Sequence, residues 1–217
     1  MIDTISGYIY GIVPFGDIIF KFSEFSTIGF IIALIFTLLV YLTKPEKQLE
    51  AKKFSGDVLI DIDINELRNR RFMAIVCGLA TAGAMLTYDL FDFALFLTLV
   101  GIANIGIVSA VKREHVLNAA FQYGLTSIIA TLPLFGAAAL ILAKTGTLSI
   151  LELEKMKSNI FFEKILYGLG MAGETGVAPY YAAKAEMFRA PGSPYILMIH
   201  LSSLLIIVKT VEILLKI

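Results

Sequence analysis

The sequence is poor in the residues from which protein metal sites are built. Among its 217 residues it has one cysteine, Cys77, and two histidines, His115 and His200. One thiol excludes an iron–sulfur cluster, a cysteine-based zinc site or an internal disulfide made by this chain alone. Cys77 lies inside an apolar run, which is typical of a small buried hydrophobic side chain. We therefore expect this chain to hold no metal and no cofactor of its own.

Sequence signatures of nucleotide-binding and hydrolytic enzymes are also missing. There is no Walker loop, no G-x-G-x-x-G motif after a predicted strand, no H-E-x-x-H and no G-x-S-x-G. An intramembrane enzyme is therefore disfavoured. The 18 basic and 18 acidic residues cancel, so no overall field attracts nucleic acid or anionic substrates.

Charged residues are scarce and apolar ones abundant. Only 17% of the residues are charged, against about 25% in soluble domains, and 58% are hydrophobic. The mean hydropathy is +0.82. Long apolar runs separated by short charged segments are typical of polytopic membrane proteins. We expect a multi-pass protein of the cell membrane, and the start of the chain lacks the basic region of a cleavable signal.

The apolar runs predict an all-α fold with six or seven transmembrane helices in a single membrane domain over residues 1–217. Residues 5–20 are apolar but contain Pro14 and Asp17. This segment is either a weak first span or a re-entrant or interfacial helix. The six clearer spans are expected over 25–42, 72–88, 92–111, 116–143, 160–183 and 195–217.

The polar segment 43–71 carries seven Lys or Arg residues. Such a basic segment favours the cytoplasmic side, and the summed bias of eleven basic residues on this side to four on the other supports a cytoplasmic loop here. Within it, VLIDIDINEL alternates apolar and acidic residues, which predicts a short edge strand or an extended interfacial segment. Asp61 and Asp63 form a D-x-D pair, but no third metal ligand has suitable spacing.

Two further features concern the spans themselves. Residues 72–111 contain only two charges, Asp89 and Asp92, which we place in a solvated turn between two spans. Pro133, inside 116–143, is expected to kink its helix unless neighbours bond the carbonyl that it leaves without a donor.

The stretch 168-GLGMAGETGVAPYYAAKAEMF-188 is apolar yet contains Glu174, Lys184 and Glu186. Gly176 and Pro179 are expected to weaken the helix just after Glu174. In transporters, interrupted helices of this kind line ion sites near the membrane midplane. Glu174 and Lys184 are therefore candidate ion-relay groups. The alternatives are a structural hydrogen-bonding role for Glu174 and an interfacial position for Lys184 and Glu186.

The last apolar run carries His200, Lys209 and Glu212. Lys209 and Glu212 are three residues apart, so they share a helix face and can pair. Histidine changes its protonation near neutral pH, as a proton relay requires. All three are candidate relay groups as well. Alternatively, His200 is a packing residue, and Lys209 and Glu212 mark a helix end that extends to water.

The segment 172-AGETGVAPYYAAKAEMFRAPGSPYILMIHLSSLLIIVKTVEILLKI-217 resembles the integral-membrane subunits of the energy-converting [NiFe]-hydrogenases of methanogenic archaea. The closest likeness is to the G-type membrane subunits of the energy-converting hydrogenase A complexes. This resemblance implies a membrane-arm subunit, without metal, that assists proton or sodium translocation coupled to electron transfer between ferredoxin and H₂. The [NiFe] centre and iron–sulfur clusters would lie in a peripheral hydrogenase arm, and other membrane subunits would be partners.

Two alternative functions remain open at this point. A self-sufficient secondary ion transporter would be expected to show an internal repeat, and the first half of the chain has no second interrupted helix to match 168–188. A purely structural membrane subunit is the other alternative.

Overall fold

The computed structural model describes residues 2–5, 8–15, 18–43, 49–52, 58–61, 63–156, 159–177, 180–188 and 195–217, with residues before Phe20 and residues 49–61 described by their backbone alone. In these ranges the chain forms helices and two small antiparallel sheets. The strands are β1 (Ile2–Ile5), β2 (Tyr8–Phe15), β3 (Ile18–Phe22), β4 (Leu49–Lys52) and β5 (Val58–Asp61). The helices are α1 (Glu24–Leu42), α2 (Ile64–Leu86), α3 (Leu90–Ser109), α4 (Glu114–Thr145), α5 (Ile150–Met156), α6 (Phe161–Thr175), α7 (Tyr181–Phe188) and α8 (Tyr195–Lys216).

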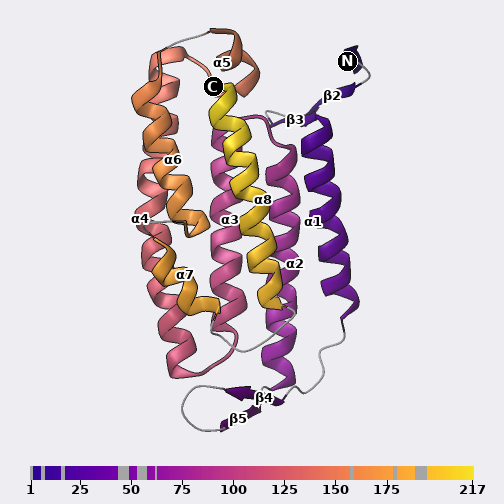
Figure 1. Cartoon of the computed structure of the whole chain (residues 1–217), viewed down its shortest axis with the longest axis vertical. Coiled ribbons are helices and arrows are strands. Elements are labelled where there is room, and N and C mark those ends of the chain that lie inside the picture. The colour runs from indigo at the N-terminus through magenta and orange to yellow at the C-terminus, as the bar shows by residue number, and fades with distance from the viewer. Residues whose placement is uncertain are drawn as a thin grey trace.

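The long helices stand side by side in one bundle (Figure 1). Helix α4, with α6 and α7 along it, forms one side; α1 forms the other; and α2, α3 and α8 lie between them. We call the end that carries α5, the α2–α3 turn and both chain termini the upper end. The end that carries β4, β5 and the α3–α4 turn is the lower end.

Four helices, α1, α3, α4 and α8, are long and apolar enough to cross a membrane. Their bounds lie within two residues of the segments predicted from the apolar runs. The membrane part of the fold is thus helical, as expected. The total of six or seven spans stays a prediction: six counts α2 and the α6–α7 segment as well, and seven would also count residues 5–20.

Helix α2 begins eight residues earlier than the predicted span, at Ile64 rather than at residue 72. Its N-cap is Asp63, whose carboxylate accepts a hydrogen bond from the Ile64 amide (2.8 Å). Such a cap starts a helix irrespective of the polarity of the turns that follow. The charged end of the expected 43–71 loop is therefore helical, and the buried Arg70 donates from Nε to the Ile107 carbonyl of α3 (2.8 Å).

The prediction of a weak span or re-entrant helix over residues 5–20 is wrong for the described residues. Strand β2 pairs with β1 and with β3 in a three-stranded antiparallel sheet. The segment is rich in Ile, Val, Tyr and Phe, which favour extended chains, and apolar composition alone does not distinguish such strands from a helix. A β-bridge between Phe20 and Thr87 joins this sheet to the upper end of the bundle.

Two other local predictions agree with the structure in part, because the INEL end of VLIDIDINEL is the first turn of α2 and Asp92 lies in the first turn of α3. The alternating VLID sequence forms β5, which pairs with β4. Asp89 lies in the turn between α2 and α3, where its carboxylate accepts from the amides of Phe91 (2.8 Å) and Asp92 (3.3 Å) and caps α3. No group of three or more acidic, His or Cys side chains suited to a metal occurs among the described residues, and the side chain of Asp61 lies outside them.

The predicted span 160–183 is two helices in the structure. Helix α6 ends at Thr175, Gly176 adopts a left-handed conformation (φ +69°), and α7 starts at Tyr181. Pro179 lies outside the described residues, so its part in an interruption stays a prediction. Figure 1 shows α6 and α7 following one another along α4, from the upper end toward the lower end.

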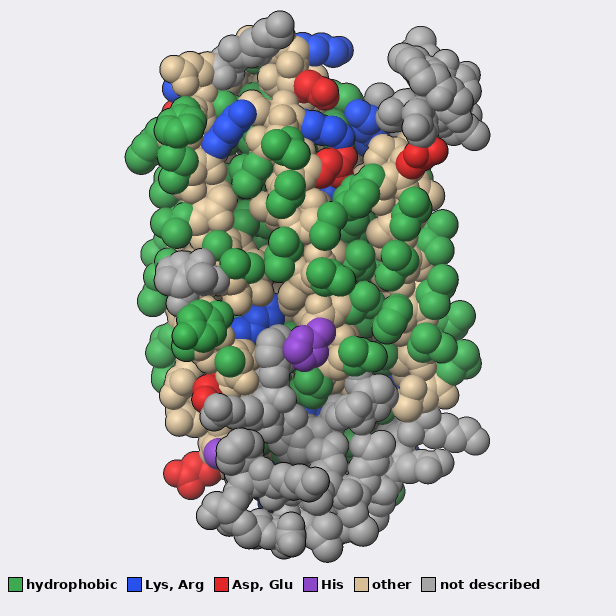
Figure 2. Space-filling model, in the orientation of Figure 1, with side chains coloured by type: hydrophobic (Ala, Val, Ile, Leu, Met, Phe, Trp, Pro, Cys, Tyr) green, Lys and Arg blue, Asp and Glu red, His purple; other side chains and the backbone are tan. Residues whose placement is uncertain are grey.

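Small residues let α6 approach α4 closely. A Cβ atom added to Gly170 would come within 2.7 Å of the Leu134 backbone nitrogen, and one added to Gly173 within 2.3 Å of the Ala130 Cβ. The bundle exposes apolar side chains around its outside, including Leu132 (71% exposed) and Leu215 (81%). Figure 2 shows this apolar surface along the bundle, with charged side chains gathered at the upper end. An apolar exterior of this kind suits contact with lipid.

Candidate functional site

The candidate site begins where α6 stops. The Gly176 amide bonds the Gly173 carbonyl (3.2 Å) and the Val177 amide bonds the Ala172 carbonyl (2.8 Å), which closes the helix with a left-handed glycine cap. Glycine suits this position because a positive φ is strained for other residues. The cap leaves Glu174 and Thr175 in the last turn, at the negative end of the helix dipole.

Glu174 is buried, with 2% of its surface exposed. Both of its carboxylate oxygens lie within hydrogen-bonding distance of the Ser127 hydroxyl of α4 (2.9 and 2.8 Å). The hydroxyl of Tyr123, one turn before Ser127, donates to the Glu174 backbone carbonyl (3.0 Å). Gly101 of α3 makes room for the carboxylate, because a Cβ there would come within 2.9 Å of Glu174 Oε2.

Lys184 of α7 approaches the same region from the other side of the break, and is 3% exposed. Its ammonium group donates to the Thr175 carbonyl (2.7 Å) at the end of α6 and to the Ser203 hydroxyl of α8. Its Nζ also lies 5.9 Å from the centre of the Tyr123 ring. A lysine ammonium at a helix carboxyl end compensates the dipole and satisfies a carbonyl that has lost its helical partner.

Glu174 and Lys184 therefore form one buried polar centre, here called the central pair, in which Tyr123 contacts both residues. Ser127 lies thirteen residues after Glu114, about 20 Å along α4, so the central pair lies near the middle of the bundle. An acid and a base at this depth can hold, exchange or pass on a proton, or hold a small cation.

The residues that complete the central pair were not identified from sequence. Ser127, Tyr123 and Gly101 come from helices α3 and α4, and only tertiary packing brings them to Glu174. A weak sequence signal existed, since Tyr123 and Ser127 are four residues apart on one face of an apolar helix.

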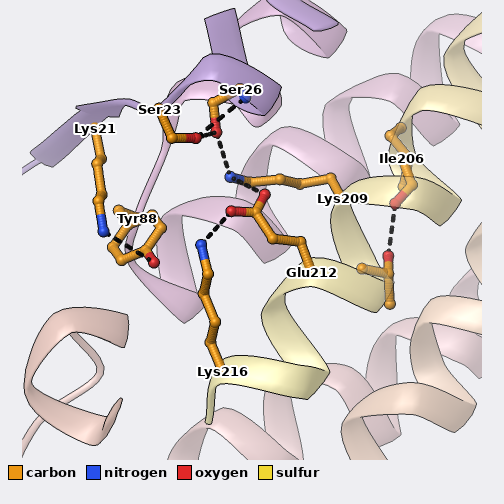
Figure 3. A network of polar contacts seen from close by, with 9 residues as sticks. Lys21, Ser23, Ser26, Tyr88, Ile206, Lys209, Glu212 and Lys216 are labelled. Carbon is orange, nitrogen blue, oxygen red and sulfur yellow. Dashed lines mark hydrogen bonds and ion pairs between the residues drawn. The ribbon is translucent and has the colours of Figure 1, made fainter. Parts of the chain in front are cut away.

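Lys209 and Glu212 form a second centre, near the upper end (Figure 3). Lys209 is fully buried, and its Nζ lies 3.0 Å from Glu212 Oε2, so the pairing predicted from their spacing is confirmed. The same ammonium donates to the hydroxyl of Ser26 in α1 (2.9 Å). Lys216 bonds the other oxygen of Glu212.

Tyr88, in the α2–α3 turn, completes this second centre. Its ring centre lies 4.3 Å from Lys21 Nζ, 5.4 Å from Lys209 Nζ and 5.2 Å from Lys216 Nζ, and Lys21 also donates to its hydroxyl (3.3 Å). Burial lowers the pKa of Lys21 below the ordinary lysine value, and the charge of Lys216 lowers it further. We call Lys21, Tyr88, Lys209, Glu212 and Lys216 the upper cluster.

The five candidate relay residues thus fall into three places. Glu174 and Lys184 lie on the two sides of the break with Tyr123 as their shared neighbour, and Lys209 and Glu212 pair in the upper cluster. His200 lies on the exposed side of α8, within electrostatic reach of Lys184. Glu186 is half-buried in α7.

A known protein family matches the sequence of this chain. The model of a family described as NADH dehydrogenase I, subunit N related protein, matches residues 1–217. An uncharacterised protein of Methanocaldococcus jannaschii is 76% identical over 218 residues, covering both chains completely. A second uncharacterised protein of that organism is 27% identical over 162 residues, which are 69% of this chain and 33% of the relative.

Among solved structures, a chain of the membrane-bound sulfane sulfur reductase, an archaeal respiratory membrane complex, is similar with a TM-score of 0.47 and 18% identity. The match covers 76% of this chain and 41% of that one.

Proposed function

Because this chain belongs to the family related to subunit N of NADH dehydrogenase I, we propose that it is a membrane-arm subunit of an energy-converting complex and helps to move protons or sodium ions across the membrane. Following the resemblance of its C-terminal segment, the complex proposed is an energy-converting hydrogenase. Electron transfer between ferredoxin and H₂ would take place at the [NiFe] and iron–sulfur centres of partner subunits, and this chain would carry none of them.

The central pair is the observation that carries this proposal. A charged side chain in the middle of a transmembrane bundle costs about 3 kcal/mol or more unless protein or water surrounds it. A purely supporting subunit has no need of a buried acid and a buried base on the two sides of a helix break. Glu174 and Lys184 occupy such positions, at 2% and 3% exposure.

Chemically, Glu174 is the group that would take up and release the ion. Its carboxylate binds a proton directly, or a sodium ion together with the Ser127 hydroxyl. Lys184 supplies a fixed positive charge whose ammonium is held by Thr175 and Ser203, so its field favours the empty, anionic form of Glu174. A change in that field, transmitted from elsewhere in the complex, would load or empty the carboxylate.

The upper cluster and His200 would then continue the path toward the two ends of the bundle. Lys209 and Glu212 lie on the upper side of the central pair, and His200 lies three residues before Ser203 on α8, toward the lower end. Their relay roles are part of the proposal and rest on polarity and position.

The test is the substitution Glu174→Gln in the purified complex, reconstituted in vesicles. The amide keeps the size and the hydrogen bond to Ser127 but cannot ionise, so ion uptake should fall about a hundredfold or more while the complex stays assembled. Glu163→Gln is the matched control, since Glu163 lies in the same helix and pairs with Lys144 at the upper end (3.2 Å). Undiminished ion uptake in Glu174→Gln would assign Glu174 a structural hydrogen bond instead.

A further inference from the structure

A buried asparagine of α3 connects the central pair to helix α2. Asn104 is 2% exposed, and its Oδ1 accepts a hydrogen bond from the thiol of Cys77 in α2 (3.3 Å). The Asn104 side chain is also within bonding reach of the Tyr123 hydroxyl in α4. Helices α2, α3 and α4 follow one another from the middle of the bundle to its side, so these contacts cross half of the bundle (Figure 1).

The hydrogen bonds of these residues run in one direction. A tyrosine hydroxyl has one proton, and Tyr123 donates it to the Glu174 carbonyl (3.0 Å). The Tyr123 oxygen can therefore only accept from Asn104, which has amide hydrogens to donate while its oxygen accepts from Cys77. The donors thus lead from α2 through α3 and α4 to the end of α6. Aligned hydrogen bonds polarise one another in an apolar interior, so each strengthens the next.

This chain of donors ends on the last turn of α6, where the carbonyl groups have no partner within the helix. Tyr123 bonds the Glu174 carbonyl, and Lys184 bonds the Thr175 carbonyl (2.7 Å). Lys184 Nζ also lies 5.9 Å from the centre of the Tyr123 ring. Tyr123 therefore fixes the backbone that carries the Glu174 carboxylate, and its ring contacts the positive charge opposite that carboxylate.

Helix α3 presents Asn104 and Gly101 on one face, because residues three apart in a helix lie one above the other. A Cβ atom at Gly101 would come within 2.9 Å of Glu174 Oε2 and 3.2 Å of Ser127 Oγ. The same face of α3 thus makes room for the carboxylate at Gly101 and reaches Tyr123 through Asn104.

We propose that Asn104 is a positioning residue of the central pair, which acts through Tyr123 to hold the end of α6 and the Glu174 carboxylate in the geometry that takes up the ion. This role rests on the proposed function of Glu174. The competing explanation is helix packing alone, in which the asparagine only joins α2 to α4, as polar side chains commonly do between membrane helices. The two explanations differ in whether Asn104 acts through Tyr123.

Ion uptake by the purified complex in vesicles is measured for Asn104→Leu, Tyr123→Phe and the double variant. Each single variant removes one link of the same chain of donors, so each should lower the rate of uptake about three- to tenfold, the value of one hydrogen bond. The double variant should be no slower than Tyr123→Phe, because the effects of two residues that act through one contact do not add.

Thr98→Val in α3 is the matched control, because the Thr98 hydroxyl donates to the Ala94 carbonyl of its own helix (2.9 Å). It should leave the rate of uptake unchanged. The pH at which the rate is half-maximal should shift by the same amount in Asn104→Leu and Tyr123→Phe, since both variants change the surroundings of one carboxylate. The control should keep the pH profile of the parent chain.

Unchanged uptake in Tyr123→Phe would overturn the proposal, whether or not the Asn104→Leu chain assembles. Additive losses in the double variant, or an equal loss in Thr98→Val, would assign Asn104 to helix packing instead.

Glu174→Gln separates this role from the proposed function. If Glu174→Gln stops uptake and Tyr123→Phe does not, only the positioning role fails. If Glu174→Gln has no effect, the proposed function fails and the positioning role falls with it.

Discussion

At the scale of single residues, the stability of each buried charge depends on the groups that contact it. The Glu174 carboxylate has one hydroxyl partner, Ser127, and Gly101 of α3 faces both of these side chains. Hydrogen bonds to charged groups are worth about 1.5–3 kcal/mol, roughly twice a neutral one. The single hydroxyl is therefore the main support of the carboxylate among the described side chains.

Ser127→Ala should lower the free energy of unfolding by about 1–3 kcal/mol, since it leaves the Glu174 carboxylate without this donor. The measurement is thermal or denaturant unfolding in detergent. Thr126→Ala is the control, because the Thr126 hydroxyl donates only to the Gln122 carbonyl of its own helix (3.0 Å). Equal stability of the two variants would show that the bond between Ser127 and Glu174 contributes nothing to the free energy of unfolding.

In the upper cluster, Glu212 forms ion pairs with two lysines. Replacing Glu212 should therefore lower the free energy of unfolding more than replacing either lysine. Glu212→Gln leaves the fully buried Lys209 without its counter-charge, and about 3–5 kcal/mol of stability should be lost. Adding Lys209→Met to that variant should restore much of the loss, because the unpaired buried charge is gone. A double variant no more stable than Glu212→Gln would contradict this account.

At the scale of elements, glycine decides how closely α6 lies against α4. The hydrogen atom of Gly173 faces Ala130, and a Cβ in its place would come within 2.3 Å of the Ala130 Cβ. The contact is with a rigid small side chain, so neither partner can rotate away.

Gly173→Val should therefore push α6 from α4, cost about 3 kcal/mol or more, and displace Glu174 from Ser127. The free energy of unfolding and the rate of ion uptake should therefore both decrease. Gly136→Ala serves as the control, since a Cβ there meets nothing within 4 Å and alanine favours the helix. A Gly173→Val chain that unfolds like the parent would show that α6 has room to shift.

An element could be predicted from sequence when its signal lies in its own residues, and not when it depends on contacts with other helices. Long apolar runs marked α1, α3, α4 and α8 because membrane length and hydropathy are properties of the chain itself. The start of α2 was missed because Arg70 looks like a loop residue until α3 provides a carbonyl for it. The strands β2 and β3 were mistaken for a span because their apolar residues suit either structure.

The residues of the site also divide into those whose signal lies in the sequence and those whose role depends on contacts between helices. Glu174 and Lys184 were found because a charge in an apolar run is visible in one sequence. The Lys209–Glu212 pair was found because both residues lie on one helix. Ser127, Tyr123 and Tyr88 were not found, because serine and tyrosine are ordinary in membrane helices and their roles depend on contacts across 47 to 67 positions of the chain.

At the scale of the whole molecule, the lower end should face the cytoplasm. It carries the basic segment that includes Arg70 and Arg71, and the turn with Lys112 and Arg113. Cysteine introduced at Glu114 should be labelled only after the membrane is made permeable, and cysteine at Glu152 should be labelled in intact cells. Cys77 is buried and gives little background. The reverse labelling pattern would invert the topology.

Assembly is the second prediction at this scale. After solubilisation in mild detergent, the chain should elute with several other membrane polypeptides and a peripheral hydrogenase arm. Elution as a monomer or homodimer that still transports ions in proteoliposomes would favour a self-sufficient secondary transporter. Elution with partners, combined with ion uptake unaffected by Glu174→Gln, would leave a purely structural subunit.

The bond between Lys209 and Ser26 also bears on how the protein is made. The two residues are 183 positions apart, so α1 leaves the ribosome and enters the bilayer long before its partner is translated. In the proposed topology, α8 must carry Lys209, Glu212 and Lys216 across the hydrocarbon layer. Glu212 pairs with both lysines on one face of that helix, which lets the segment neutralise itself during insertion. Only afterwards does Lys209 reach Ser26, so the contact between α1 and α8 forms once both helices are in the bilayer.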